Sequence, residues 1–214
     1  MAVYGGMLVG GASRRMGRPK ALVEVDGVTL AERAAAALAP HVDRLLLLGA
    51  GPVPEALAGL ERLPDAALPH ASPAVPQDRP PGPLAGLLAA LRRSPRTAWV
   101  LCSCDLPWVA PEAVAWLLAE RHPQRLAVIP RLAAGAPPEP LFALYEPAAR
   151  PAVEALAARG ERAPWRLAGQ PGMALVTVPP HLARCWRDAD TPEELPESAA
   201  GIGNRRNGRA VGTP

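Results

Sequence analysis

Apolar runs alternate along the chain with stretches in which apolar residues recur at helical spacing, and this alternation predicts its elements. The expected strands cover residues 1–9, 43–48, 66–68, 98–102, 126–129, 141–145 and 174–178, with a short extended piece at 22–25. The expected helices cover residues 30–38, 54–63, 84–93, 111–121 and 147–158, with a further turn or helix at 162–168 and a short helix from 191 to 195. Strands that alternate with helices favour an α/β fold with a mostly parallel, doubly wound sheet, which binds its ligands beyond the carboxyl ends of the strands.

Residues at the element ends agree with these boundaries. Thr29 can cap the helix over 30–38, and Pro40 ends it. Asp26 and Gly27 form a turn dipeptide, and the four consecutive leucines over 45–48 are typical of a central strand buried on both faces.

The chain has 214 residues, a length typical of one large domain that can bury a substantial core. We expect this domain to span residues 1–196, with a long proline-rich surface loop at 71–83 and a disordered tail over 197–214. The net charge of +3 comes from scattered basic residues and does not require a nucleic-acid partner. The three cysteines are wrongly spaced for a structural zinc site, and no secretory signal or long apolar span is evident, so we expect a cytoplasmic protein without a membrane segment.

The segment after the first expected strand has the composition of a phosphate-binding loop. Gly10, Gly11 and Gly17 let the backbone approach a ligand closely, and the side chains of Arg14, Arg15 and Lys20 supply positive charge. No Gly-Lys-Ser/Thr follows and no Gly-x-Gly-x-x-Gly is present, which excludes a Walker A loop and a dinucleotide fingerprint. The structural alternative is a basic, glycine-rich surface turn.

Asp105 follows the apolar strand over 98–102, where a doubly wound fold places its ligands. A carboxylate at this position is a hard oxygen ligand suited to Mg²⁺, although an acid there could also cap the turn before Pro107. Cys102 and Cys104 on the same segment are better interpreted as small buried residues than as metal ligands.

Two further segments carry candidate binding residues. The helix that begins with Gly82, Pro83, Leu84 and Gly86 has a positive dipole end that can face a nucleotide, or it is only a common helix start. Asp78, just before it, could accept hydrogen bonds from a guanine base or from a ribose. Asp188 and Asp190 would point the same way in an extended segment and could complete a metal site, or Asp190 or Thr191 could cap the helix that follows.

Residues 8–22 match every defined position of the pattern L-x-G-G-x-S-x-R-M-G-x-x-K-x-L, the signature of nucleotidyltransferases with a Rossmann-like fold. Five further motifs follow in order along the chain: G-P-L-A-G, C-x-C-D-x-P, P-L-x-A-L-Y, A-x-G-E-R and T-P-E-E-L. With these motifs, residues 3–195 resemble the molybdenum cofactor guanylyltransferases. The resemblance implies a three-layer Rossmann-like nucleotidyltransferase fold. It also implies transfer of GMP from GTP to the terminal phosphate of Mo-molybdopterin, with release of pyrophosphate, assisted by Mg²⁺ or alternatively Mn²⁺.

The same resemblance assigns individual residues. Leu8, Val9, Gly10, Lys20 and Asp78 would hold GTP, Asp105 would hold both GTP and the metal, and Arg15 and Lys20 would contact the leaving pyrophosphate. We therefore predict that Arg15, Lys20 and Asp105 are catalytic, and that Asp105, Asp188 and Asp190 bind metal. The predicted nucleotide site comprises Leu8, Val9, Gly10, Gly11, Ser13, Arg14, Lys20, Asp78, Gly82, Pro83, Leu84, Gly86 and Asp105.

Some positions depart from the family pattern. Val9 replaces the usual alanine, no asparagine occurs over 48–51, and Asp188 and Asp190 stand where the family often has asparagine. The alternatives are therefore a cytidylyltransferase using CTP, an enzyme that joins a nucleotide to another phosphorylated acceptor, and a non-catalytic carrier of nucleotide or cofactor. Besides the two substrates, the resemblance allows transient contacts with molybdopterin-insertion proteins and with molybdoenzymes that accept the cofactor.

Overall fold

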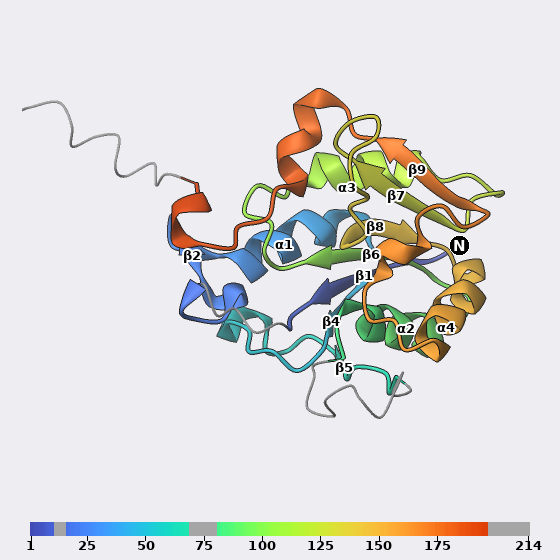
Figure 1. The fold of residues 1–214 in the computed structure, drawn as a ribbon. Helices are drawn as coiled ribbons and strands as arrows, with labels where there is room; N and C mark the ends of the chain where they lie inside the picture. The colour runs from blue at the N-terminus through green and yellow to red at the C-terminus, as the bar shows by residue number, and fades with distance from the viewer. Residues whose placement is uncertain (11–15, 69–80, 197–214) are drawn as a thin grey trace, which may run out of the picture.

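The computed structural model describes residues 1–10, 16–68 and 81–196, and these residues form a central seven-stranded sheet with helices on both faces (Figure 1). The strands lie in the order β5-β4-β1-β6-β8-β7-β9, and a separate two-stranded hairpin pairs β2 with β3. Their bounds are β1 Val3–Leu8, β2 Glu24–Val25, β3 Val28–Thr29, β4 Arg44–Leu48, β5 Arg62–Leu63, β6 Ala98–Ser103, β7 Ala127–Arg131, β8 Phe142–Tyr145 and β9 Met173–Thr177. The mostly parallel sheet confirms the predicted fold class.

Four α-helices of the described chain form the two outer layers. They are α1 Leu30–Leu38, α2 Pro83–Arg93, α3 Pro111–Ala119 and α4 Arg150–Ala158. Helices α1 and α3 cover one face, and α2 and α4 cover the other (Figure 1). Short 3₁₀ helices connect these elements: Lys20–Leu22, Ala39–His41, Glu55–Leu57, Pro147–Ala149, Pro164–Leu167, Pro180–Trp186 and Pro192–Glu194.

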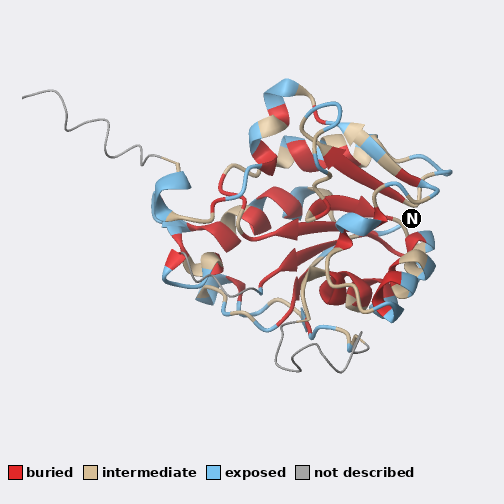
Figure 2. Cartoon of the chain, in the orientation of Figure 1, coloured by how far each residue is buried: buried red, intermediate tan, exposed pale blue. Residues whose placement is uncertain are grey.

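The central strands β1, β6 and β8 are buried on both faces, because successive side chains point to opposite layers that are both covered by helices. On β6, Val100 packs in the core with α1 and α3, whereas Trp99 and Leu101 pack in the core with α2 and α4. Figure 2 shows the central strands buried along most of their length. This explains why the predicted strands read as continuous apolar runs.

Strand β8 departs from the parallel arrangement and thereby shapes the functional edge. It lies between β6 and β7 and is antiparallel to both. Its first residue, Phe142, pairs with Cys102 near the carboxyl end of β6. The loop that precedes β8 is consequently brought to the same edge of the sheet as the carboxyl ends of the parallel strands.

Two predicted elements are wrong. The segment predicted as a helix over 54–63 contains only the 3₁₀ turn Glu55–Leu57, and Arg62 and Leu63 pair with β4 as β5. Gly59, which disfavours a continuous helix, separates the two parts. The segment predicted as a strand over 66–68 has no regular structure, because the strand beside β4 is formed four residues earlier.

Thr29 caps α1 as predicted, through a reciprocal pair of hydrogen bonds. Its hydroxyl accepts from the backbone N–H of Glu32 at 3.2 Å, and the Glu32 carboxylate accepts from the Thr29 N–H at 2.9 Å. No helix within the described ranges has the length and apolar character needed to cross a bilayer. The predicted tail over 197–214 lies outside the described residues.

Candidate active site

Lys20 connects the start of the chain to two acidic residues that are distant in sequence. Its Nζ lies 2.9 Å from Oδ2 of Asp105 and 2.6 Å from Oδ1 of Asp190. Burial lowers the pKa of Lys20, but the hydrogen bonds and charges of the two carboxylates outweigh this and leave the pKa raised. Lys20 therefore keeps its positive charge at neutral pH in this position.

Local structure places each of the three groups. Lys20 opens the 3₁₀ turn Lys20–Leu22, and Asp105 follows β6 directly. The Asp105 carbonyl accepts a 3.0 Å hydrogen bond from the N–H of Ala189, which fixes the neighbouring Asp190 beside it. A small apolar cluster of Met16, Val23, Val25, Leu30 and Ala189 packs this closing segment against the hairpin and α1.

Asp105, Asp188 and Asp190 form an acidic cluster at this edge. One carboxylate oxygen from each lies within 4.8 Å of the others. Partial burial and the neighbouring charge of Asp105 raise the pKa of Asp188, as expected where acidic groups crowd together. Three carboxylate oxygens are the hard donor set that Mg²⁺ and Mn²⁺ prefer, so these residues fit a divalent cation.

Two hollows meet at Asp105. A small one, about 40 Å³, lies between Val9, Gly10, Lys20 and Gly51 and is also bordered by Ser103 and Asp105. A larger cavity of about 410 Å³ lies on the other side and is again bordered by Ser103 and Asp105. The end of β6 therefore separates two binding spaces and contributes side chains to both.

Prolines and aromatic rings form much of the larger cavity's wall. Trp186 stacks on Phe142 with 4.7 Å between ring centroids, and its indole N–H donates to the Phe142 carbonyl at 2.8 Å. Pro83, the segment 163–165, the loop over 137–141 and Asp188 also line this cavity. This size is typical of a small-molecule site.

Asp65 is a candidate binding residue that the sequence analysis missed. It follows β5 at the carboxyl edge, and burial raises its pKa. A Cβ added at Gly49 or at Gly86 would lie 3.6–3.8 Å from its carboxylate oxygens, so Asp65 borders two positions that have no side chain. In the sequence, Asp65 could have been found as an acidic residue just after a short strand. The strand was missed because a helix was predicted over 54–63.

The loop after β4 is held against the start of the phosphate-binding segment. Arg62 donates to the carbonyls of Gly49 at 2.8 Å and Gly51 at 2.9 Å. A Cβ at residue 51 would overlap the carbonyl oxygen of Val9, so only glycine permits this close approach. Sequence analysis did not single out Gly51, although it borders the small hollow.

The remaining predicted residues lie in different surroundings. The side chains of Leu8 and Val9 are buried in the core, and Gly10 is exposed beside the small hollow. Pro83 borders the larger cavity, whereas Leu84 is fully buried in the core. Gly11, Ser13, Arg14, Arg15 and Asp78 lie outside the described residues, and their roles stay predictions.

The start of α2 packs more tightly than a free helix end would. The N–H of Leu84 donates to the carbonyl of Arg162 at 3.0 Å, and a Cβ at Gly82 would lie 2.8 Å from the same oxygen. Gly86 is buried, and a Cβ there would lie 2.8 Å from Leu8 Cδ2. These glycines therefore permit close packing of α2, and any role in nucleotide binding stays a prediction.

The cysteines are free and buried, in agreement with their interpretation as small core residues. Burial, together with the nearby charge of Asp105, raises the pKa of Cys104 to about 12. It also raises the pKa of Cys102. Both remain thiols at neutral pH, which makes them poor nucleophiles and poor metal ligands.

A family model described as the MobA-like NTP transferase domain matches residues 5–173. The chain belongs to this family. It is 33% identical over 169 residues to the molybdenum cofactor guanylyltransferase of Burkholderia orbicola (strain MC0-3), an alignment that covers 75% of this chain and 78% of that protein. It is 31% identical over 147 residues to the molybdenum cofactor biosynthesis bifunctional protein of Synechocystis sp., covering 69% of this chain but 40% of that protein.

A solved structure shares the fold of this MobA-like chain. The molybdopterin-guanine dinucleotide biosynthesis protein A from Archaeoglobus fulgidus superposes with a TM-score of 0.65 at 24% identity, covering 89% of this chain and 93% of that one. The two hollows that Ser103 and Asp105 border are therefore the candidate site of this nucleotidyltransferase-family chain.

Proposed function

We propose that this protein transfers GMP from GTP to the terminal phosphate of Mo-molybdopterin and releases pyrophosphate. An oxygen of the acceptor phosphate attacks the α-phosphorus of GTP, and the bond from that phosphorus to the pyrophosphate oxygen breaks. Chemistry of this kind depends on positioning and on charge stabilisation more than on an acid or a base.

The observation that carries the proposal is that Ser103 and Asp105 border both hollows at the carboxyl edge of the sheet. The small hollow is lined by Val9 and Gly10, which lead into the predicted phosphate-binding loop, and by Lys20. The larger cavity has the size for a second, ring-containing substrate. A carrier of one ligand would not need two spaces joined at a carboxylate.

The chain's own groups have distinct roles in this proposal. Lys20 exchanges its contacts with Asp105 and Asp190 for the phosphates of the nucleotide, whose negative charge attracts the same ammonium group. Asp105, Asp188 and Asp190 would hold the divalent cation. When bound, that cation supplies positive charge to the phosphate oxygens.

Asp65 supports guanine as the base. A carboxylate can accept two parallel hydrogen bonds, and the N1–H and 2-amino groups of guanine supply that pair of donors. Cytosine offers an amino donor next to an acceptor nitrogen, which a carboxylate does not match. Asp65 lies exposed just after β5, and its carboxylate is beside Gly49 and Gly86, which carry no side chain.

Asp65→Asn should raise the KM for GTP about fivefold or more, because a bidentate pair contributes about 1–3 kcal/mol of discrimination between bases. Steady-state kinetics with GTP and CTP measure the change, and the ratio of the two kcat/KM values should fall. Asp78→Asn, at the acid that the family resemblance assigns to GTP, is the comparison variant, and Glu112→Gln is the control. If Asp78→Asn raises the KM for GTP and Asp65→Asn does not, the base is recognised by Asp78 and not by Asp65.

The reaction itself is tested by pyrophosphate release with GTP, Mo-molybdopterin and Mg²⁺, with mass spectrometry of the dinucleotide product. Asp105→Asn should lower kcat at least 100-fold, because removing one group that stabilises charge in the transition state typically has this effect. Glu112→Gln, an exposed acid in the first turn of α3, is the control and should leave kcat unchanged. Activity of Asp105→Asn within tenfold of the wild type would contradict the assignment.

The same assay separates the alternatives. Asp188 and Asp190, which replace the asparagines frequent in the family, leave CTP as the second candidate nucleotide. Product with CTP but not with GTP would identify a cytidylyltransferase. Nucleotide binding without pyrophosphate release would identify a carrier.

A further inference from the structure

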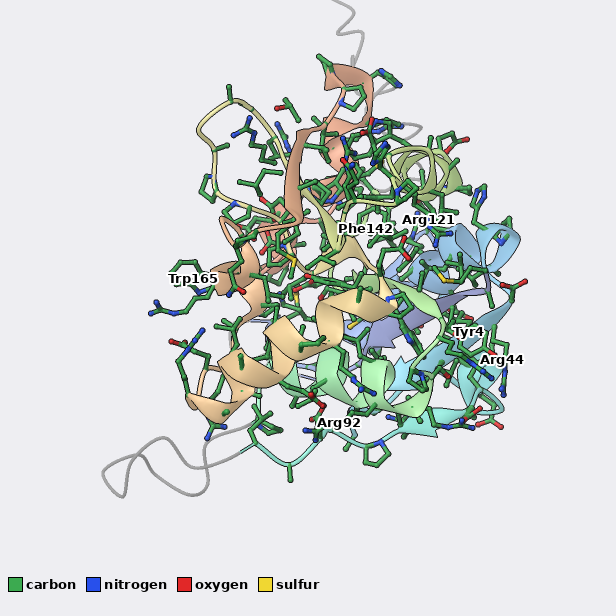
Figure 3. All side chains as sticks on the ribbon, turned by 90° about the vertical axis from the view of Figure 1, so that its right-hand side faces the viewer. Tyr4, Arg44, Arg92, Arg121, Phe142 and Trp165 are labelled. Atoms are coloured by element: carbon green, nitrogen blue, oxygen red, sulfur yellow. The ribbon has the colours of Figure 1, made fainter. Side chains whose placement is uncertain are left out.

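Glu139 and Trp165 both line the larger cavity and have no role in the reaction as described so far. Trp165 lies on the 3₁₀ turn Pro164–Leu167, and Glu139 lies in the loop before β8. Figure 3 shows Trp165 at the surface of the molecule. The two side chains offer different kinds of contact to a ligand in this cavity.

Trp165 is an aromatic side chain left open to solvent. Its side chain is 51% exposed, although the indole is large and apolar. The Arg166 guanidinium lies over the ring, 4.7 Å from its centroid, and Arg166 is itself held by an ion pair with Glu161 at 2.9 Å. A braced, exposed aromatic ring at a cavity wall is a suitable stacking surface for a flat ligand.

Glu139 is held in place by its backbone rather than by its side chain. Its N–H donates to the carbonyl of Pro130 at 2.8 Å. The Tyr145 hydroxyl donates to the carbonyl of the next residue, Pro140, also at 2.8 Å, and Pro138 forms a bridge with Arg131. Within the described chain no side chain is paired with the Glu139 carboxylate, which borders the cavity in a half-buried position.

The charges of the cavity limit what an acceptor can present to it. Asp188 and Glu139 both border it, so an anionic group is repelled unless a cation accompanies it. The phosphate of an acceptor therefore belongs at the acidic cluster with the divalent ion. Glu139 lies close enough to Asp188 for their charges to interact, and its carboxylate suits a neutral ring that donates hydrogen bonds.

We propose that Glu139 and Trp165 recognise the pterin ring of the acceptor, with the Glu139 carboxylate accepting from the ring's N3–H and 2-amino groups and Trp165 stacking on its face. The assignment rests on the proposed function for the identity of the acceptor. It makes these two residues the specificity determinants of the acceptor site, separate from the groups that hold the nucleotide.

Kinetics provide the first test. Glu139→Gln should raise the KM for molybdopterin about tenfold or more, because an amide cannot accept both hydrogen bonds, whereas the KM for GTP should stay within twofold. Trp165→Leu should raise the acceptor KM about tenfold and Trp165→Phe much less, since phenylalanine keeps an aromatic face for stacking and leucine does not. Glu112→Gln, which borders neither hollow, is the control. An unchanged acceptor KM in Glu139→Gln and Trp165→Leu would overturn the proposal.

Direct binding separates this inference from the proposed reaction. Isothermal calorimetry of the wild-type protein with 6-hydroxymethylpterin should give an affinity at least tenfold higher than with the matching lumazine, in which a carbonyl replaces the 2-amino donor. Glu139→Gln should remove that preference. Equal affinity for the two rings, absence of pterin binding at millimolar concentration, or a preference retained in Glu139→Gln would contradict ring recognition. A pterin preference without pyrophosphate release would support ring recognition while contradicting the proposed reaction.

Discussion

Lys20 is the residue at which the two ends of the described chain meet. Its ammonium group contacts Asp105 after β6 and Asp190 in the closing segment, so it neutralises part of an acidic cluster in the free protein. A divalent cation would supply the same neutralisation. We infer that a bound cation would free Lys20 for the nucleotide phosphates, which would couple the two binding events.

Glu139 should make the protein less stable at neutral pH than it would be with a neutral side chain there. Burial and the charge of Asp188 raise its pKa above the ordinary value of 4.5. Because its pKa is raised, Glu139 binds a proton more tightly in the folded state than in the unfolded state. The stabilisation that comes from this protonation is complete below pH 4.5 and is lost as pH rises through the folded-state pKa. Glu139→Gln should therefore raise Tm at pH 7, and the gain should shrink at acidic pH.

Thermal unfolding followed by circular dichroism at several pH values measures this effect. Because the Asp188 charge contributes to the raised pKa, the gain from Glu139→Gln at pH 7 should be smaller in an Asp188→Asn background. A Tm gain that is equal at all pH values would show that the carboxylate charge is not its cause.

Individual site residues differed in how far sequence could reveal them. Lys20 and Asp105 were predictable because each follows a strongly apolar strand within a recognisable motif. Asp65 follows a strand of only two residues, too short for a periodic signal. Glu139 lies in a proline-rich loop, and its place beside Asp188 depends on the antiparallel pairing of β8, which residue pattern alone does not indicate.

At the scale of elements, the loop after β4 connects the sheet to the part of the site proposed to bind the nucleotide. Arg62 on β5 binds the carbonyls of Gly49 and Gly51, and Gly51 lies directly against Val9. The same segment explains the wrongly predicted helix over 54–63. Apolar spacing there resembles a helical pattern, but Gly59 weakens a helix and the pairing of β5 with β4 places Arg62 where it can hold the loop.

Gly51→Ala should destabilise the protein by about 1–3 kcal/mol, the usual cost of forcing extra atoms into a packed site. The added methyl group would overlap the Val9 carbonyl and displace the start of the phosphate-binding segment, so affinity for GTP should also fall. Gly59→Ala is the matched control, since a Cβ there meets nothing within 4 Å. Chemical denaturation and calorimetric titration with GTP measure the two effects, and equal behaviour of the two variants would contradict the close approach.

At the scale of the whole molecule, the two halves of the sheet carry different groups of the candidate site. The side from β5 to β6 presents Asp65, the Gly51 loop and Lys20, the groups assigned to the nucleotide. The side from β8 to β9 carries the loop with Glu139, and this loop lines the larger cavity. The antiparallel β8 lies between the halves, and its first residue, Phe142, starts at the edge where Asp105 lies.

This division predicts that nucleotide binding stabilises the whole fold, because a ligand that binds only the folded state raises Tm. At a GTP concentration 100 times its Kd, with Mg²⁺ present, the stabilisation is about 2.7 kcal/mol, which corresponds to a Tm increase of roughly 5–10 °C for a chain of this size. CTP, ATP and UTP at the same concentration should produce much smaller shifts. Asp105→Asn should reduce the GTP shift, and omitting Mg²⁺ should reduce it in the wild type. A larger shift with CTP would reassign the base, and the absence of a shift with all four nucleotides would contradict a nucleotide site at this edge of the sheet.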